Sequence, residues 1–253
     1  MKKESNPVHA DETKRQSLFA WSVHLFTASG AIFSLLAIIA ITQQQWPLVF
    51  IWMAAAVAVD AFDGILARRA HVKQVLPNFN GSLLDNIIDY QNYVIVPAFF
   101  FYSAGILPEA FAVVGAGLTV LASAYQFCQE DAKTDDHYFK GFPSYWNVAV
   151  FYLFMLGLNP WLNLALVIFL CILVFVPIKY IYPTRTEANQ RLTMTLAMIW
   201  ALSCIAIILQ YPNPDPELVW FSLLYVAYYV GLSLYHTDKG GFFRTAARRL
   251  SSR

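Results

Sequence analysis

Charged residues are scarce in this chain of 253 residues. Asp, Glu, Lys and Arg together make up 13% of the sequence, whereas apolar residues make up 58% and are spread along its whole length. Such a composition leaves no segment that reads as a soluble domain, and it provides no basic surface of the kind that binds nucleic acid. It predicts a single polytopic membrane domain.

Residues that bind zinc are few as well. The sequence has three cysteines and five histidines. Cys128, Cys171 and Cys204 stand alone, without Cys-x-x-Cys spacing, so we interpret them as small apolar helix residues. No His-Glu-x-x-His motif occurs, and no internal repeat or low-complexity tract is present. The sequence therefore lacks the common zinc-binding motifs.

The apolar segments predict an all-α bundle of eight transmembrane helices. We place them at residues 19–42, 46–67, 83–105, 107–127, 145–158, 161–182, 192–211 and 218–235. The fifth is short for a hydrocarbon layer about 30 Å thick. Residues 1–18 are expected to be a cytoplasmic segment that can lie on the membrane as a helix, 19–236 the transmembrane catalytic domain, and 237–253 a basic cytoplasmic tail. Because a polar stretch precedes a long apolar run, we expect no cleavable signal peptide.

Basic residues test this arrangement independently. If the N-terminus is cytoplasmic, all 17 lysines and arginines lie on one side, in the two terminal segments and in the second, fourth and sixth loops. The positive-inside rule then places both termini at the cytoplasmic face. That face should attract anionic lipid.

Four aspartates stand at the ends of the second and third predicted helices, on the same cytoplasmic side. Asp60 and Asp63 are spaced i, i+3, and Asp85 and Asp89 are spaced i, i+4, so each pair shares one helix face. An acid at the centre of a membrane helix costs roughly 3 kcal/mol. Something must therefore compensate these carboxylates, and a bound metal ion is the obvious candidate.

Small residues accompany the acids. Gly64 and Ala67 share the face of the first pair, and Gly81 lies one turn before the second pair, so a bulky ligand can approach the backbone there. Arg68 follows directly and would suit a phosphate oxygen.

The candidate ligands are all carboxylate oxygens, which favours Mg²⁺ or Mn²⁺ over zinc. Four acids on two adjacent helices can hold two ions, an arrangement that clamps the attacking and leaving oxygens in phosphoryl displacement. Two alternatives stay open at this point. Acids at helix ends can simply be solvated, and acids inside a bundle can line the cation pathway of a transporter. Against a transporter, the acids gather at one edge of the membrane rather than at its middle.

The acids and small residues form a pattern of eight fixed positions, Asp60-x2-Asp63-Gly64-x2-Ala67-Arg68 followed by Gly81-x3-Asp85-x3-Asp89. This pattern resembles the signature of the CDP-alcohol phosphatidyltransferases, membrane enzymes that displace CMP from a CDP-linked alcohol or lipid. The connection from Arg69 to Asn80 has twelve residues and is longer than is usual in that family. The longer connection and the eight spans resemble the bacterial phosphatidylcholine synthase branch, and residues 139–147, Phe-Lys-Gly-Phe-Pro-Ser-Tyr-Trp-Asn, are similar to a loop-to-helix segment of that branch.

The resemblance implies an enzyme of the bacterial inner membrane whose active site faces the cytoplasm. It would transfer the phosphatidyl group of CDP-diacylglycerol to choline and release CMP. Two Mn²⁺ or Mg²⁺ ions would be bound by Asp60, Asp63, Asp85 and Asp89, with Asp89 also acting as the general base. CDP would be bound by Asp60, Gly64, Ala67, Arg68, Gly81 and Asp85.

Aromatic side chains are the candidates for choline, because a trimethylammonium group is recognised by aromatic faces. The residues nearest the predicted chemistry are Tyr90, Tyr145 and Trp146, although Trp and Tyr are enriched at membrane interfaces in any such protein. Lys179 and Arg185 are candidates for lipid phosphate or, alternatively, snorkelling anchors.

Two other functions remain open, namely the same chemistry with serine or a polyol phosphate as acceptor, and a divalent-cation transporter. Membrane lipids are expected partners and nucleic acid is not. A homo-oligomer is left open, since no dimerisation motif stands out.

Overall fold

The computed structural model describes residues 7–187 and 189–239. The described chain is mostly helical and divides into two compact units, Met1–Val96 and Pro97–Arg253. Residues 1–6 and 240–253, which belong to the two predicted terminal segments, lie outside the described residues.

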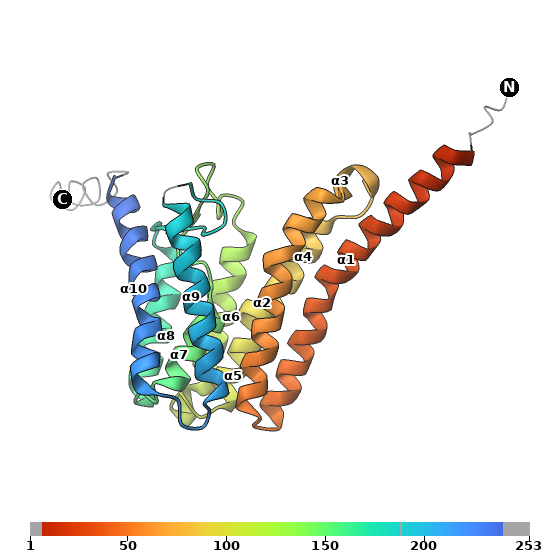
Figure 1. Ribbon diagram of the computed structural model, residues 1–253. Helices are drawn as coiled ribbons and strands as arrows, with labels where there is room; N and C mark the ends of the chain where they lie inside the picture. Colours follow the sequence, from red (N-terminus) through yellow and green to blue (C-terminus); the bar gives the residue numbers. More distant parts are fainter. Residues whose placement is uncertain (1–6, 188, 240–253) are drawn as a thin grey trace. The chain divides into compact units, whose positions relative to one another are not determined.

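The first unit consists of helices and short turns. It contains α1 (Pro7–Thr42), α2 (Trp46–Arg69), α3 (Val72–Val75) and α4 (Gly81–Tyr90). Helices α1 and α2 lie antiparallel, and α4 packs against α1 (Figure 1). Both long helices bury small side chains, Ala37 and Ala40 on α1 and Ala56 on α2, as helices that approach closely within a membrane commonly do.

Helix α4 continues into a π turn, η1 (Gln91–Ile95), and then into α5 (Val96–Ser103). The turn is closed by the backbone N–H of Val96, which donates to the carbonyl oxygen of Gln91 five residues earlier. The single helix predicted over residues 83–105 is therefore present but interrupted. Single π turns inside α-helices are rare and are frequent at functional sites.

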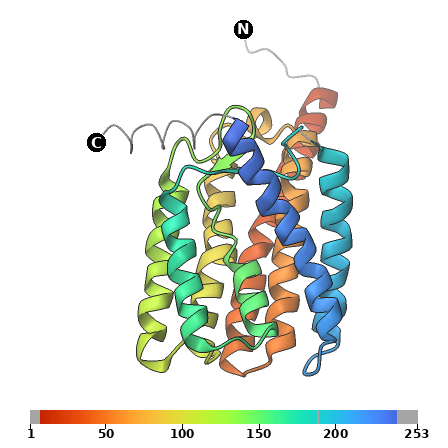
Figure 2. The same cartoon turned by 90° about the vertical axis from the view of Figure 1, so that its left-hand side faces the viewer.

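The second unit contains the remaining helices and a small sheet. After α5 come the 3₁₀ turn η2 (Glu109–Phe111), α6 (Ala112–Cys128), α7 (Trp146–Met155), α8 (Pro160–Phe175), α9 (Gln190–Leu209) and α10 (Pro216–Lys239). Helix α6 packs beside α8, and α9 beside α10 (Figure 2). Strands β1 (Tyr138–Lys140) and β2 (Lys179–Ile181) pair antiparallel, and β2 lies against α10.

Five described stretches are long and apolar enough to cross a membrane, judged by length and composition: Lys14–Thr42, Trp46–Arg69, Glu109–Cys128, Gln190–Leu209 and Pro216–Asp238. They correspond to the first, second, fourth, seventh and eighth predicted spans, while α7 and α8 are shorter apolar helices. The predicted helical membrane protein is confirmed. The count of eight spans and the cytoplasmic position of the termini stay predictions.

Two boundaries differ from the sequence prediction. Helix α1 begins at Pro7 and runs without a break past the predicted boundary between residues 18 and 19. The sixth predicted span was extended to residue 182, whereas α8 ends at Phe175 and residues 179–181 form strand β2. Pro177 explains the second difference, because the residue before a proline disfavours the helical conformation, and Val176 is extended with ψ 120°. The short sheet is the one departure of the described chain from the predicted all-α class.

Candidate functional site

Three of the four signature aspartates come together in the first unit. Asp60 on α2 and Asp85 and Asp89 on α4 each offer a carboxylate oxygen, and these oxygens all lie within 4.8 Å of one another. All three residues are half-buried. Like charges this close repel, so the group favours a shared cation. Carboxylate oxygens are the ligands that Mg²⁺ and Mn²⁺ prefer, and the arrangement can hold such an ion.

Asp63 lies one turn further along α2 and is only 7% exposed. Its carboxylate lies near the side chains of Thr27 on α1 and Asp85 on α4, and Asp60 is close enough to repel it. Because ionised carboxylates only accept hydrogen bonds, a cation near Asp63 and Asp85 would offset their repulsion. Asp63 therefore belongs to the same acidic site but lies deeper in it.

The last turn of α2 brings a positive charge beside the acids. Arg68 is exposed, and a Cβ placed on Gly64 would lie 3.3 Å from its Nη1 atom, so the guanidinium passes over the glycine. Ala67 packs against the apolar cluster formed by Ala20, Val23, Ala70 and Val72. Gly64 thus leaves room for the arginine, whereas Ala67 contributes to the contact between α1 and α2.

The space beside Gly81 is filled by a residue that the sequence analysis did not select. A Cβ placed on Gly81 would lie 2.5 Å from Cε1 of His24, closer than real Cβ atoms approach their neighbours. His24 is 6% exposed and packs against the ring of Phe79, with the centroids 4.5 Å apart. Its Nε2 atom has no hydrogen-bond partner among the described residues. A glycine is therefore required here by the packing of α4 against α1.

The long connection between α2 and α4 is folded back on the unit. Val72 of α3 joins the apolar cluster with Ala20, Val23 and Ala70. At the end of the connection Asn80 caps α4, since its side chain accepts a hydrogen bond of 3.0 Å from the backbone N–H of Leu83. These contacts fix the start of α4 one turn before Asp85.

Tyr93, on the π turn, is a second residue that the sequence analysis missed. Its hydroxyl donates a hydrogen bond of 2.7 Å to Oδ2 of Asp60. The signal was present in the spacing, because Tyr93 follows Asp89 by four residues and so lies near the same helix face. Tyr90, the predicted choline residue beside Asp89, is half-buried at the end of α4.

The other two predicted choline residues lie in the second unit and differ from each other. Trp146 is fully buried, and its Nε1–H donates a 2.7 Å hydrogen bond to Oγ of Ser123. Tyr145 is half-buried, and its ring centroid lies 6.2 Å from that of Phe139 and 6.3 Å from that of Tyr229. The polar edge of Trp146 is thus already satisfied within the protein.

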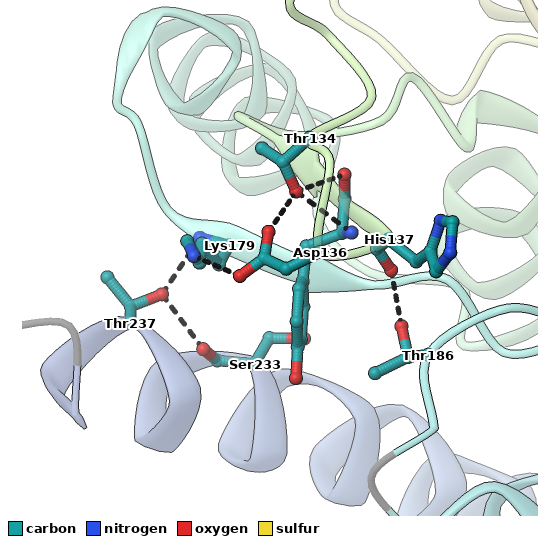
Figure 3. Close-up of polar contacts among 8 residues, drawn as sticks. Thr134, Asp136, His137, Lys179, Thr186, Ser233 and Thr237 are labelled. Atoms are coloured by element: carbon teal, nitrogen blue, oxygen red, sulfur yellow. Dashed lines mark hydrogen bonds and ion pairs between the residues drawn. The ribbon is translucent and has the colours of Figure 1, made fainter.

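Lys179, a predicted lipid-phosphate residue, is engaged by the loop before β1. Its Nζ lies 2.5 Å from Oδ2 of Asp136, and its backbone N–H donates to the hydroxyl of Thr237 (Figure 3). The hydrogen bond from Lys179, with a second one from Thr134, holds the pKa of Asp136 below its usual value. Arg185, the other candidate, is exposed.

The comparison with known families extends this picture to most of the chain. The CDP-alcohol phosphatidyltransferase model matches residues 23–178, which include all four aspartates and the whole signature. The chain belongs to the CDP-alcohol phosphatidyltransferase family. The predicted family is thereby confirmed, and the chain is a transferase.

Relatives within the family are similar over almost their full length. A phosphatidylcholine synthase of Legionella pneumophila is 42% identical over 239 residues, which cover 92% of this chain and 94% of the relative. A phosphatidylcholine synthase of Pseudomonas aeruginosa is 38% identical over 238 residues, covering 93% and 99% respectively. A third, from Agrobacterium fabrum, is 37% identical over 217 residues, covering 85% and 88%.

Proposed function

We propose that this chain is a phosphatidylcholine synthase, which transfers the phosphatidyl group of CDP-diacylglycerol to choline and releases CMP. The observation that carries the proposal is the group of three carboxylates, held within 4.8 Å by α2 and α4 at signature positions. Its support is the 42% identity to a relative of that name over nearly the whole chain.

In this proposal the acids bind the ions and the neighbouring residues bind CDP. Asp60, Asp63 and Asp85 hold two Mn²⁺ or Mg²⁺ ions, with Asp89 completing the set. When bound, the ions neutralise the charge that develops on the pyrophosphate during displacement. Arg68 pairs with a phosphate oxygen, for which a guanidinium is well suited. The remaining CDP residues of the proposal are Gly64, Ala67, Gly81, Asp60 and Asp85, of which Ala67 also packs in the apolar cluster and Gly81 against His24.

Asp89 is proposed as the general base that accepts the proton of the choline hydroxyl. A carboxylate is a weak base for an alcohol, so its position matters more than its basicity. Asp89 is half-buried in the acid group, beside the carboxylates of Asp60 and Asp85 that would hold the ions.

The acceptor contacts are proposed from ring geometry. Tyr90 directly follows the proposed base, and Tyr145 has a half-buried ring among other aromatic rings. Both suit a trimethylammonium group. Trp146 is the less favoured of the three, because it is buried and its Nε1–H is bonded to Ser123. Arg185 is exposed and is the more available lipid-phosphate residue, since Lys179 is paired with Asp136.

We also propose that the protein lies in a bacterial inner membrane, with eight spans and with both termini and the acidic site at the cytoplasmic face. The support is the placement of all 17 basic residues on one side of the predicted topology. A cytoplasmic site is also where a water-soluble acceptor would meet a nucleotide-activated lipid.

The test is an acceptor assay on the purified full-length protein. CDP-diacylglycerol and Mn²⁺ are supplied with radiolabelled choline, ethanolamine, serine or glycerol 3-phosphate, and labelled lipid and CMP are measured. We expect labelled phosphatidylcholine with choline, little product with the other acceptors, and no product in excess EDTA or with Asp60→Asn.

If serine or glycerol 3-phosphate gave product as fast as choline does, the proposal of choline as the specific acceptor would be overturned. If no acceptor gives a product and the protein takes up Mn²⁺ into proteoliposomes, the proposed function would change from an enzyme to a transporter. Full turnover in excess EDTA would overturn the metal-dependent mechanism.

A further inference from the structure

The hydrogen bond between Tyr93 and Asp60 links two helices at the acidic site. Tyr93 belongs to η1, which continues α4, whereas Asp60 belongs to α2. The bond of 2.7 Å therefore ties Asp60, a carboxylate of α2, to the helix that carries Asp85 and Asp89. The donor, Tyr93, is not one of the eight signature positions.

The π turn determines where Tyr93 points. The N–H of Val96 bonds to the carbonyl oxygen of Gln91 five residues earlier, whereas an α-helical N–H bonds four residues back. The extra residue widens the helix beside the acids and rotates the chain that follows by about 100°, the angle of one α-helical residue. Such a turn is less favourable than continued α-helix, and where it persists it is commonly associated with a function.

Tyr93 lies between two buried residues of the turn, the first of which contacts α1. The preceding residue, Asn92, is 4% exposed and its Oδ1 accepts a hydrogen bond from the hydroxyl of Ser34. The following residue, Val94, is fully buried. Helix α1 approaches closely here, since a Cβ placed on Gly30 would lie 3.2 Å from Nδ2 of Asn92. Tyr93 is thus presented to Asp60 from a backbone that has little freedom to move.

We propose that Tyr93 is a positioning residue for the metal site. Its hydroxyl holds one oxygen of Asp60 and so sets the direction in which the carboxylate is offered to a cation. This inference rests on the proposed metal-dependent function. Carboxylates that bind metals are typically held by such an outer hydrogen bond, and removing it costs 10- to 100-fold in metal affinity or activity, as a rough range.

The experiment is a Mn²⁺ titration of the purified full-length protein, with free Mn²⁺ measured by electron paramagnetic resonance. Tyr93→Phe should bind Mn²⁺ about 10- to 100-fold more weakly than the wild type. Its melting temperature in EDTA should be unchanged. Because the residue acts through Asp60, saturating Mn²⁺ should restore kcat.

Two variants bracket this result. Asp60→Asn should lose Mn²⁺ binding. Tyr228→Phe is the matched control, since it removes a hydroxyl that shares a 2.9 Å hydrogen bond with Thr193 in the second unit. It should bind Mn²⁺ as the wild type does.

The outcomes separate the inference from the proposed function. If Asp60→Asn binds Mn²⁺ normally, the metal site itself is wrong. If Asp60→Asn loses binding while Tyr93→Phe binds normally, only the role of Tyr93 is wrong. A Tyr93→Phe enzyme with normal Mn²⁺ affinity and a raised choline KM would instead place Tyr93 in contact with the acceptor. Recovery of kcat at high Mn²⁺ is the second readout, because a loss of folded protein does not respond in that way.

Discussion

The two units of this protein treat their carboxylates in opposite ways. In the second unit, the loop before β1 carries Asp131 and Asp136. Asp131 is paired with Lys140 and Asp136 with Lys179, and each Nζ–Oδ2 distance is 2.5 Å. In the first unit Asp60, Asp85 and Asp89 lie half-buried within 4.8 Å of one another, with Asp63 near Asp85. The two ion pairs of the second unit are neutral as they stand, whereas the acidic group of the first unit accumulates negative charge.

Buried polar groups do not separate the units in this way. In the second unit Tyr152 bonds to Ser222 and Trp200, and Trp146 to Ser123, but the buried Oγ of Ser144 and Oδ1 of Asn163 have no hydrogen-bond partner among the described residues. In the first unit His24 has a buried Nε2 with no hydrogen-bond partner among the described residues. A buried polar atom left unpaired costs roughly 1–3 kcal/mol. The difference that remains is in the carboxylates: the second unit pairs Asp131 and Asp136 with its own lysines, whereas the first holds an acidic group whose repulsion a bound cation would relieve.

The largest effect is expected from neutralising the acids of the first unit. Asp89→Asn should lower kcat by about 10²- to 10⁴-fold, the usual contribution of a general base, while retaining donor affinity. Asp63→Asn should lose donor affinity as well. Both should still fold, because neutralisation also removes the cost of placing a charge in a membrane helix. The measurements are kcat, the KM for CDP-diacylglycerol and the melting temperature.

Asp131→Asn is the matched control in the second unit. It breaks an exposed ion pair, so activity should stay within about twofold and the melting temperature should be nearly unchanged. Near wild-type turnover by Asp89→Asn would require another base, and comparable losses in Asp131→Asn would remove the functional distinction between the units.

A second, smaller effect concerns Gly81. Gly81→Ala should destabilise the protein by about 1–3 kcal/mol, because its Cβ would meet Cε1 of His24. Adding His24→Ala should relieve part of that loss, which a double-mutant cycle of melting temperatures would measure. Gly117→Ala on α6 is the control, since a Cβ there meets nothing within 4 Å and should be tolerated. A loss of activity in Gly81→Ala that His24→Ala does not relieve would favour a ligand-space role for the glycine.

Much of the helical fold and of the acidic site can be predicted from the sequence, because the signals that decide them are local. The spacing of Asp60, Asp63, Asp85 and Asp89 placed each pair on one helix face, and three of the four carboxylates indeed meet. Apolar runs located most of the helices. The positions of the family signature are close together in the chain, so the signature can be recognised without knowledge of the tertiary structure.

The missed features depend on contacts between distant segments. His24 beside Gly81 and Thr27 beside Asp63 follow from how α1 packs on α2 and α4, which no short motif encodes. The π turn is a small change in backbone register that hydrophobic periodicity does not resolve. The topology places Lys179 on the side that suits a lipid phosphate, whereas its partner in the structure, Asp136, is 43 residues away in the sequence.

The smallest expected effect tests whether Lys179 belongs to the scaffold or to the substrate site. As a scaffold residue it pairs with Asp136, and Lys179→Met and Asp136→Asn should each change stability by roughly 0–1 kcal/mol, as exposed ion pairs do. Neither should alter the KM for CDP-diacylglycerol by more than about twofold, a change of about 0.4 kcal/mol at 1.4 kcal/mol per tenfold.

Because the pKa of Asp136 is lowered in the folded protein, its contribution to stability is present at neutral pH and is lost as the pH falls from about 5 through that lowered pKa. The melting temperatures of the two variants and the wild type should therefore converge in acid. If Lys179 contacts lipid phosphate instead, Lys179→Met alone raises the KM for CDP-diacylglycerol, and Asp136→Asn, which frees the lysine, lowers it or leaves it unchanged.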